Sequence, residues 1–297
     1  MNPDQIVLGA SEVPCILGLS PWRSPSAMWA ILTGLMSGDG TSNATKRGSV
    51  MEIGVLWDYA ESKGLEIHKW EEIRDGLDAI AVPPKPGVYR GPSIAQPRMT
   101  HPTHSWCGAR PDGFLIAENG ERRLIEVKTC RSFRDWNDKD GNEIIPPHYM
   151  IQVQWQMFVT GINVCDVEAF CTIEDSRRSY EVRYNDELIK RVFQIVSSWR
   201  DDHLLGSKLP ENITYEVAGL VWPAPREPET WLDPDDEDML DGLTYAKISG
   251  QIKELEEKKD IIKSKLCAKI KDTHGINRVA SWKWSKRGRM FRCLIDA

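Results

Sequence analysis

Two short stretches decide the fold, Pro111-Asp112-Gly113 and Ile125-Glu126-Val127-Lys128. Side chains two residues apart on a β-strand point to the same face, so Glu126 and Lys128 would lie together, roughly 6.6 Å apart along the strand. Ile125 and Val127 then point to the opposite face, toward a core. With an aspartate on the preceding strand, the pattern predicts two carboxylates and one ammonium at one point of a sheet.

This set of groups is typical of phosphodiester hydrolysis, which needs an activated water and a positive clamp on the developing negative charge. Magnesium supplies both, and it prefers carboxylate oxygens with water in the remaining positions. We therefore expect Asp112 and Glu126 as metal ligands, with the backbone carbonyl of Val127 as a further ligand. Lys128 would orient the attacking water and assist its deprotonation.

The register between the two strands decides whether Asp112 reaches this cluster. The turn contains Asn119-Gly120, a sequence that favours tight hairpin turns. A strict two-residue turn would place Asp112 opposite Val127, on the wrong face. We therefore expect either a three-residue loop of Asn119, Gly120 and Glu121 or a bulge at Gly113, each of which sets Asp112 opposite Lys128.

Three more polar residues lie where apolar ones would be ordinary. Glu52 borders the apolar stripe of a helix predicted over residues 46–63, a stripe that includes Val50 and Leu56. Gln152 and Gln156 share one face of a second helix that begins near Pro147, among large apolar side chains. A half-buried carboxylate is unfavourable unless it is paired or bound to metal, and both amides would need partners if they are buried. The alternative for Glu52 is an ion pair on the surface.

Composition places the 297-residue chain among ordinary globular proteins, with 41% hydrophobic and 28% charged residues. It has no apolar run of 18 residues, and seven widely spaced cysteines indicate reduced thiols, so we expect a cytoplasmic location. The formal charge is −6, but residues 223–241 hold eight acids and one base. Without them, 36 of the 44 acids and 37 of the 38 bases remain, a balance of +1. Net charge therefore does not exclude a nucleic-acid substrate.

The chain divides into three expected regions. Residues 1–222 alternate helical and strand patterns, which predicts one mixed α/β domain. Residues 223–241 are rich in Pro and Asp and are expected to form a linker or strap. Residues 242–297 predict an amphipathic helix and then a basic, aromatic hairpin. The hairpin carries Lys283, Lys286 and Arg287, and we expect its basic residues to contact DNA phosphates, with packing on the preceding helix as the alternative.

Taken in order, the motifs resemble the YqaJ-like viral recombinase family, which is phage lambda exonuclease-like and part of the PD-(D/E)XK nuclease superfamily. The matching motifs are Gly9-Ala10-Ser11-Glu12-Val13 together with Ile16-Leu17-Gly18-Leu19-Ser20-Pro21, Arg47-Gly48 with Glu52, Gly108 to Gly113, Glu126-Val127-Lys128, and Tyr149-Met150-Ile151-Gln152-Val153-Gln154. Five ordered motifs are more specific than any one. The resemblance implies a PD-(D/E)XK core, a mixed central sheet flanked by helices.

The resemblance also implies a function. Asp112 and Glu126 would bind Mg²⁺, with Mn²⁺ able to substitute, Lys128 would assist the water, and Glu52 and Gln152 would complete the site. One strand of duplex DNA would be degraded from its 5′ end, leaving a 3′ overhang for a single-strand annealing protein. A homotrimer encoded by a phage or prophage, and acting in a bacterial host cell, is the implied context.

The phosphate-binding residues match this family less well. Ser11 matches, but Asp4 and Arg110 stand where the family often has Arg and Ser that hold a 5′ phosphate. Arg110 would restore positive charge near the 5′ phosphate from another side of the site. Arg23 and Arg47 flank the early motifs as further phosphate contacts, with solvated helix ends as the alternative.

Two rival functions use the same residues. A restriction-type or repair endonuclease shares the core but would also cut closed circular DNA. A protein that binds DNA ends without turnover would keep the fold and show no metal-dependent hydrolysis.

Overall fold

The computed structural model describes residues 5–38, 43–82, 96–224, 231–285 and 288–295. Their contacts divide the chain into two compact units, Met1–Ala224 and Pro225–Ala297, which we describe separately. In the part of the chain described, no helix combines the length and apolar character needed to cross a membrane.

The first unit is built on a five-stranded sheet with the order β2-β6-β7-β8-β9. Its strands are β2 (Glu66–His68), β6 (Gly113–Ile116), β7 (Arg122–Cys130), β8 (Val164–Cys171) and β9 (Ser176–Arg183). Within this sheet β7 and β8 pair in parallel, and the other neighbouring strands pair antiparallel. A parallel pair needs a crossover, which is supplied by α5 (Pro147–Thr160).

A smaller sheet has the order β1-β5-β4-β3. Its strands are β1 (Leu8–Gly9), β5 (Cys107–Ala109), β4 (Arg98–Thr100) and β3 (Ile80–Val82). The other helices of this unit are α1 (Val13–Ile16), α2 (Pro25–Leu32), α3 (Asn43–Lys63), α4 (Trp70–Ile73), α6 (Asp186–Arg200) and α7 (Tyr215–Val221). In the described part of this unit, both sheets and seven α-helices therefore form one mixed α/β arrangement, as the sequence predicts.

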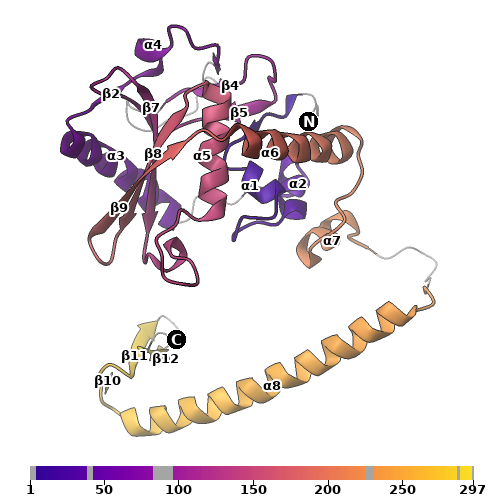
Figure 1. The fold of residues 1–297 in the computed structure, drawn as a ribbon. Helices are drawn as coiled ribbons and strands as arrows, with labels where there is room; N and C mark the ends of the chain where they lie inside the picture. Colours follow the sequence, from indigo (N-terminus) through magenta and orange to yellow (C-terminus); the bar gives the residue numbers. More distant parts are fainter. Residues whose placement is uncertain (1–4, 39–42, 83–95, 225–230, 286–287, 296–297) are drawn as a thin grey trace. The chain divides into compact units, whose positions relative to one another are not determined.

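Helices α5 and α3 cover opposite faces of the five-stranded sheet (Figure 1). Helix α5 begins at a Pro-Pro pair and ends at Gly161, whose φ of 73° is left-handed. It buries Val153, Trp155 and Met157 in the larger core. On the other face, α3 packs Leu56 against the β7 residues that flank Glu126. The strand that carries the predicted site is therefore covered on both sides.

Two details of the sequence analysis are wrong. Val50 is 75% exposed rather than buried on the stripe of α3. The hairpin loop has three residues, as expected, but they are Glu118 to Gly120, with Gly120 at φ 80°. Because Gly113 pairs with Ile125, continuing this register places Asp112 level with Glu126 instead of Lys128. The shift is two residues, so Asp112 still lies on the expected face.

The second unit consists of a long helix and a small sheet. Helix α8 (Asp236–Ile270) begins six residues before the helical region expected from the sequence, because Asp235 caps it through a hydrogen bond from the Asp238 N–H, 2.8 Å long. The sheet contains β10 (Gly275–Ile276), β11 (Ala280–Ser285) and β12 (Gly288–Cys293) in that order. The indole N–H of Trp282 donates to the Lys271 carbonyl at 3.2 Å, so the hairpin packs on the end of α8.

Candidate active site

Glu126 is the centre of the candidate site. It lies on β7, is 2% exposed and faces α5. Its Oε1 accepts hydrogen bonds from Lys128 and from the Gln152 amide, the latter at 2.5 Å. Its Oε2 accepts one from the Gln156 amide at 2.8 Å. Both carboxylate oxygens therefore have charged or amide donors, which is what a buried carboxylate needs.

Asp112 is the second carboxylate, and it immediately precedes β6. Its Oδ2 accepts a hydrogen bond from the backbone N–H of Val127 at 2.8 Å, so Asp112 is fixed against the strand that carries Glu126. Burial first, and then repulsion from Glu126 and Glu52, raise the pKa of Asp112 well above its usual value. Three carboxylates thus share one desolvated region, where their charges repel.

Glu52 on α3 is the third member of this group. Its pKa is raised, chiefly by burial and then by the Glu126 charge, while hydrogen bonding to Asp112 and the charges of Lys128 and Arg110 oppose the shift. The structure therefore brings Glu52 to the site and not to a surface ion pair.

Lys128 is the positive charge of the site, with a side chain 17% exposed that pairs with Glu126. Burial lowers its pKa, but attraction to Glu126 and Asp112 is stronger and leaves the pKa raised. Lys128 is therefore an ammonium group that donates hydrogen bonds. Its Nζ also lies 5.0 Å from the centre of the Tyr149 ring.

The chemistry of these donors fits a divalent cation. Glu52, Asp112 and Glu126 face one lysine, which leaves two negative charges when all are ionised, and hard carboxylate oxygens are the donors that Mg²⁺ prefers. Among the described residues, no three His, Cys, Asp or Glu side chains are already arranged around a common ligand position. Glu126 instead turns to Lys128 and the two glutamines.

Among the predicted site residues, Glu52, Asp112, Glu126, Lys128 and Gln152 come together, and Val127 joins them through its N–H. Gln156 also joins the site, although it was not among the predicted site residues. Its signal was the four-residue spacing from Gln152, which puts both amides on one face of α5.

The predicted phosphate-binding residues are scattered. Arg110 is exposed next to the site, and Ser11 is exposed on the turn before α1. Arg23 is half-buried before α2, and Lys283 is exposed on β11 of the second unit. The side chain of Arg47, and Lys286 and Arg287 entirely, lie outside the described residues.

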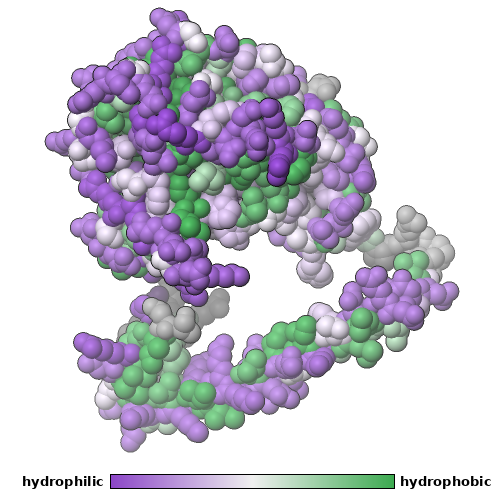
Figure 2. Space-filling model, in the orientation of Figure 1, coloured by the Kyte–Doolittle hydropathy of each residue, from purple (hydrophilic) through white to green (hydrophobic). Residues whose placement is uncertain are grey.

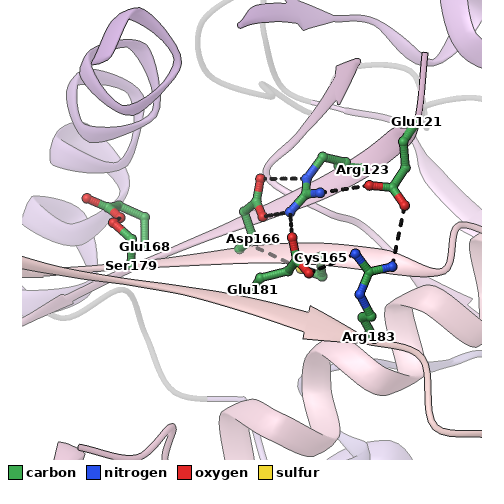
Figure 3. Close-up of polar contacts among 8 residues, drawn as sticks. All are labelled: Glu121, Arg123, Cys165, Asp166, Glu168, Ser179, Glu181 and Arg183. Atoms are coloured by element: carbon green, nitrogen blue, oxygen red, sulfur yellow. Dashed lines mark hydrogen bonds and ion pairs between the residues drawn. The ribbon is translucent and has the colours of Figure 1, made fainter. Parts of the chain in front are cut away.

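A separate charged cluster lies on the α3 side of the sheet (Figure 3). Arg123, with 12% of its side chain exposed, forms two hydrogen bonds with Asp166, at 3.1 and 2.5 Å. It also bonds Glu121 and Glu181, at 2.8 and 2.7 Å. Three carboxylates satisfy one guanidinium, so this cluster links β7, β8 and β9.

Comparison with known proteins identifies related chains. The sequence model of the YqaJ-like viral recombinase domain matches residues 4–163. An uncharacterized protein, YqaJ of Bacillus subtilis (strain 168), is 26% identical over 207 residues, which cover 68% of this chain. The chain spans only 55% of the length of that relative.

Solved structures also match. The alkaline exonuclease LHK-Exo of Laribacter hongkongensis has 21% identity and a TM-score of 0.48, covering 68% of this chain and 89% of that one. A phage-related exonuclease of Haemophilus somnus 129PT has 12% identity and a TM-score of 0.44, covering 68% of this chain and 96% of that one.

Proposed function

This chain belongs to the family of YqaJ-like viral recombinase domains, and on that premise we propose that it is a nuclease, more specifically a Mg²⁺-dependent exonuclease acting on linear duplex DNA. One observation carries the proposal: Asp112, Glu126 and Lys128 converge at one buried point of the central sheet. Aspartate before one strand and Glu-x-Lys on the next is the PD-(D/E)XK pattern, realised here in three dimensions.

The metal would be held by Asp112 and Glu126, with the Val127 carbonyl as a further ligand, and Mn²⁺ would substitute for Mg²⁺. When bound, it would lower the pKa of a water so that a hydroxide can attack phosphorus, and it would place positive charge next to the phosphate oxygens. The chain's own groups do the rest. Gln152 and Gln156 fix the Glu126 carboxylate, and Glu52 adds a carboxylate beside Asp112.

Lys128 acts as an oriented ammonium. Because its pKa is raised, it donates hydrogen bonds to the attacking water and to the developing negative charge. Proton removal from the water then falls to a carboxylate of the cluster. Glu52 is the candidate, because its carboxylate lies beside that of Asp112, a proposed metal ligand.

We also propose the finer features that family membership implies. DNA would be degraded 5′ to 3′ to leave 3′ overhangs for a single-strand annealing protein, by a homotrimer in the cytoplasm. Arg110, Ser11, Arg23 and Arg47 would contact the phosphates of the DNA near the active site. The hairpin would add contacts through Lys283, Lys286 and Arg287.

The test is digestion of linear duplex DNA labelled separately at each 5′ and 3′ end, with Mg²⁺ or with chelator, beside a closed circular control. The proposal expects Mg²⁺-dependent release of nucleotides from 5′ ends and an intact circle. Cleavage of the circle would identify an endonuclease, and binding of ends without hydrolysis would identify an end-binding protein. Either result overturns the proposal.

A further inference from the structure

A row of aromatic rings extends outward from the catalytic lysine. Tyr149 lies beneath Lys128, and His148 lies 4.1 Å from Tyr149 between ring centres. Trp22 follows, 4.9 Å from His148 at 88° and 6.0 Å from Tyr149. We call Trp22, His148 and Tyr149 the aromatic shelf.

Trp22 is the outer end of this shelf and is 69% exposed. Its backbone N–H donates to the Ser20 hydroxyl at 3.3 Å, which fixes the turn that presents it. Single exposed aromatic residues are ordinary on protein surfaces, so exposure alone carries no function. Here the exposed indole continues a row of edge-on and tilted ring contacts that begins at the Lys128 ammonium.

His148 supplies a second observation. Its Nε2 is buried and has no hydrogen-bond partner among the residues that the structure describes. Buried polar atoms are usually bonded, so this nitrogen has capacity for a group outside the chain. Burial, and then the Lys128 charge, lower the pKa of His148, so the ring is neutral near pH 7 and presents one donor and one acceptor.

We propose that the aromatic shelf binds the nucleobase of the nucleotide whose phosphate lies beside Lys128, with the base stacked on Trp22. The proposal rests on the proposed function and adds a base-binding subsite to it. An indole face accepts every base, because every base has a π-face. Such a subsite would hold a frayed end nucleotide without sequence preference.

The test compares Trp22→Ala, Trp22→Phe and a control, Trp222→Ala, on duplexes whose terminal nucleotide is either normal or abasic. Trp222 is exposed to a similar extent, 60%, at the end of α7. Trp22→Ala should lower kcat/KM about tenfold on the normal end, the ratio given by a stacking contribution of about 1.4 kcal/mol. On the abasic end it should match the wild type. Trp22→Phe should retain most activity, and the control should retain all of it.

An equal loss of kcat/KM on normal and abasic ends would overturn the proposal that the aromatic shelf binds a base, as would no loss at all. Failure of the proposed function would look different, because the wild type would then hydrolyse neither duplex. In that case, fluorescence of single-stranded DNA with 2-aminopurine at its end still tests the shelf. Binding should quench the probe in the wild type and not in Trp22→Ala, and equal quenching overturns the shelf.

An independent observation in the second unit concerns α8. Figure 2 shows apolar residues along the visible side of this helix. Large apolar side chains that are about half or more exposed occur along its length: Met239, Leu240, Leu243, Tyr245, Ile248, Ile252, Leu255, Ile261 and Ile262. Six apolar residues alternate in steps of three and four, interrupted only at Lys259: Tyr245, Ile248, Ile252, Leu255, Ile262 and Leu266. This is the spacing of a coiled-coil seam.

Charge along α8 indicates what covers this seam. Residues 235–241 contain five acids and no base, and residues 263–271 contain four lysines and no acid. Two copies side by side in parallel would oppose like charges at both ends. Antiparallel copies would oppose acids and lysines, and one register places Ile252 opposite Leu255 and Asp238 opposite Lys269.

We infer that the seam of α8 pairs antiparallel with α8 of a second copy of this chain. The register is nearly symmetric about the middle of the helix, as a two-fold interface between identical chains requires. Acid and lysine ends also suit the dipole of a single helix, so the test must separate pairing from helix stability.

The test measures the mass of the full chain in solution by analytical ultracentrifugation. Reversing two lysines, Lys265→Glu with Lys269→Glu, should halve the assembled mass, from a pair of the proposed homotrimers to one, and adding Asp238→Lys with Asp241→Lys should restore it. Circular dichroism checks that the helix persists. A mass that never changes would overturn the inference, as would be found if α8 packs within its own chain. A mass that the second pair of reversals fails to restore would also overturn it.

Discussion

Replacing Gln156 by Met tests how firmly the Glu126 carboxylate must be held. The change keeps the volume of the side chain but removes the 2.8 Å hydrogen bond to Glu126 Oε2. A hydrogen bond to a charged group contributes about 1.5–3 kcal/mol, which corresponds to roughly 10- to 150-fold in rate. Loss of a group that orients a metal ligand costs about 10- to 100-fold in activity. Because Lys128 and Gln152 still hold Oε1, we expect the lower end, about tenfold.

Stability should respond differently from activity. The Gln156 Oε1 is buried without a partner among the described residues, so removing it relieves a cost of about 1–3 kcal/mol and offsets the lost bond. The control is Gln154→Met on the same helix. Both of its amide atoms bond at 2.8 Å, to the Arg183 carbonyl and the Asn185 N–H, away from Glu126. Its loss should lower stability by about 2–3 kcal/mol and leave activity intact.

The assay is initial rates of duplex hydrolysis over a Mg²⁺ titration, with urea unfolding followed by tryptophan fluorescence. The expected signatures are opposite: Gln156→Met loses activity at nearly unchanged stability, and Gln154→Met loses stability at unchanged activity. Wild-type rates in Gln156→Met, or an equal loss of activity in both variants, would refute the view that α5 positions Glu126.

Three further predictions concern Asp112, the cluster around Arg123 and the C-terminal hairpin. In chelator, Asp112 should make stability depend on pH, because its pKa is raised in the folded protein. Its contribution to stability is present below its unfolded pKa of about 3.9 and is lost as pH rises through the folded value. The urea midpoint of unfolding should therefore fall as pH rises, and it should fall less in Asp112→Asn. Arg123→Met leaves Asp166 buried without its cation and should lower the unfolding free energy by about 3–5 kcal/mol. The double variant Arg123→Met with Asp166→Leu should recover most of this loss. A loss under about 1 kcal/mol in Arg123→Met would contradict a buried ion pair. Truncation after Thr273 should weaken DNA binding and flatten its salt dependence, and an unchanged salt slope in a folded truncate would make the hairpin purely structural.

The sequence was sufficient to group several side chains of the candidate site, because their placement depends on local geometry. Period-two alternation puts Glu126 and Lys128 on one face, and an i, i+4 pair puts Gln152 and Gln156 on one side of a helix. These geometries depend on few neighbours, and the structure confirms the contacts among them.

Features that depend on the whole fold were harder to predict. The loop starts one residue earlier than expected, because the last residue of a three-residue loop is left-handed, which favours Gly120 (φ 80°) over Glu121. The exposure of Val50 depends on how far the sheet beneath α3 extends, which periodicity does not report. The cluster around Arg123 joins residues from three strands, and no spacing in the sequence signals their meeting.

The most direct test of the central claim compares the wild type with Asp112→Asn and Lys128→Met by single-turnover hydrolysis and by calorimetric Mg²⁺ binding. Both variants should keep the fold and lose hydrolysis, the lysine variant by about 10²- to 10³-fold, as for the loss of one donor to developing negative charge. Mg²⁺ binding should weaken in Asp112→Asn and persist in Lys128→Met, because an ammonium is not a ligand. Wild-type hydrolysis by Asp112→Asn would contradict the account.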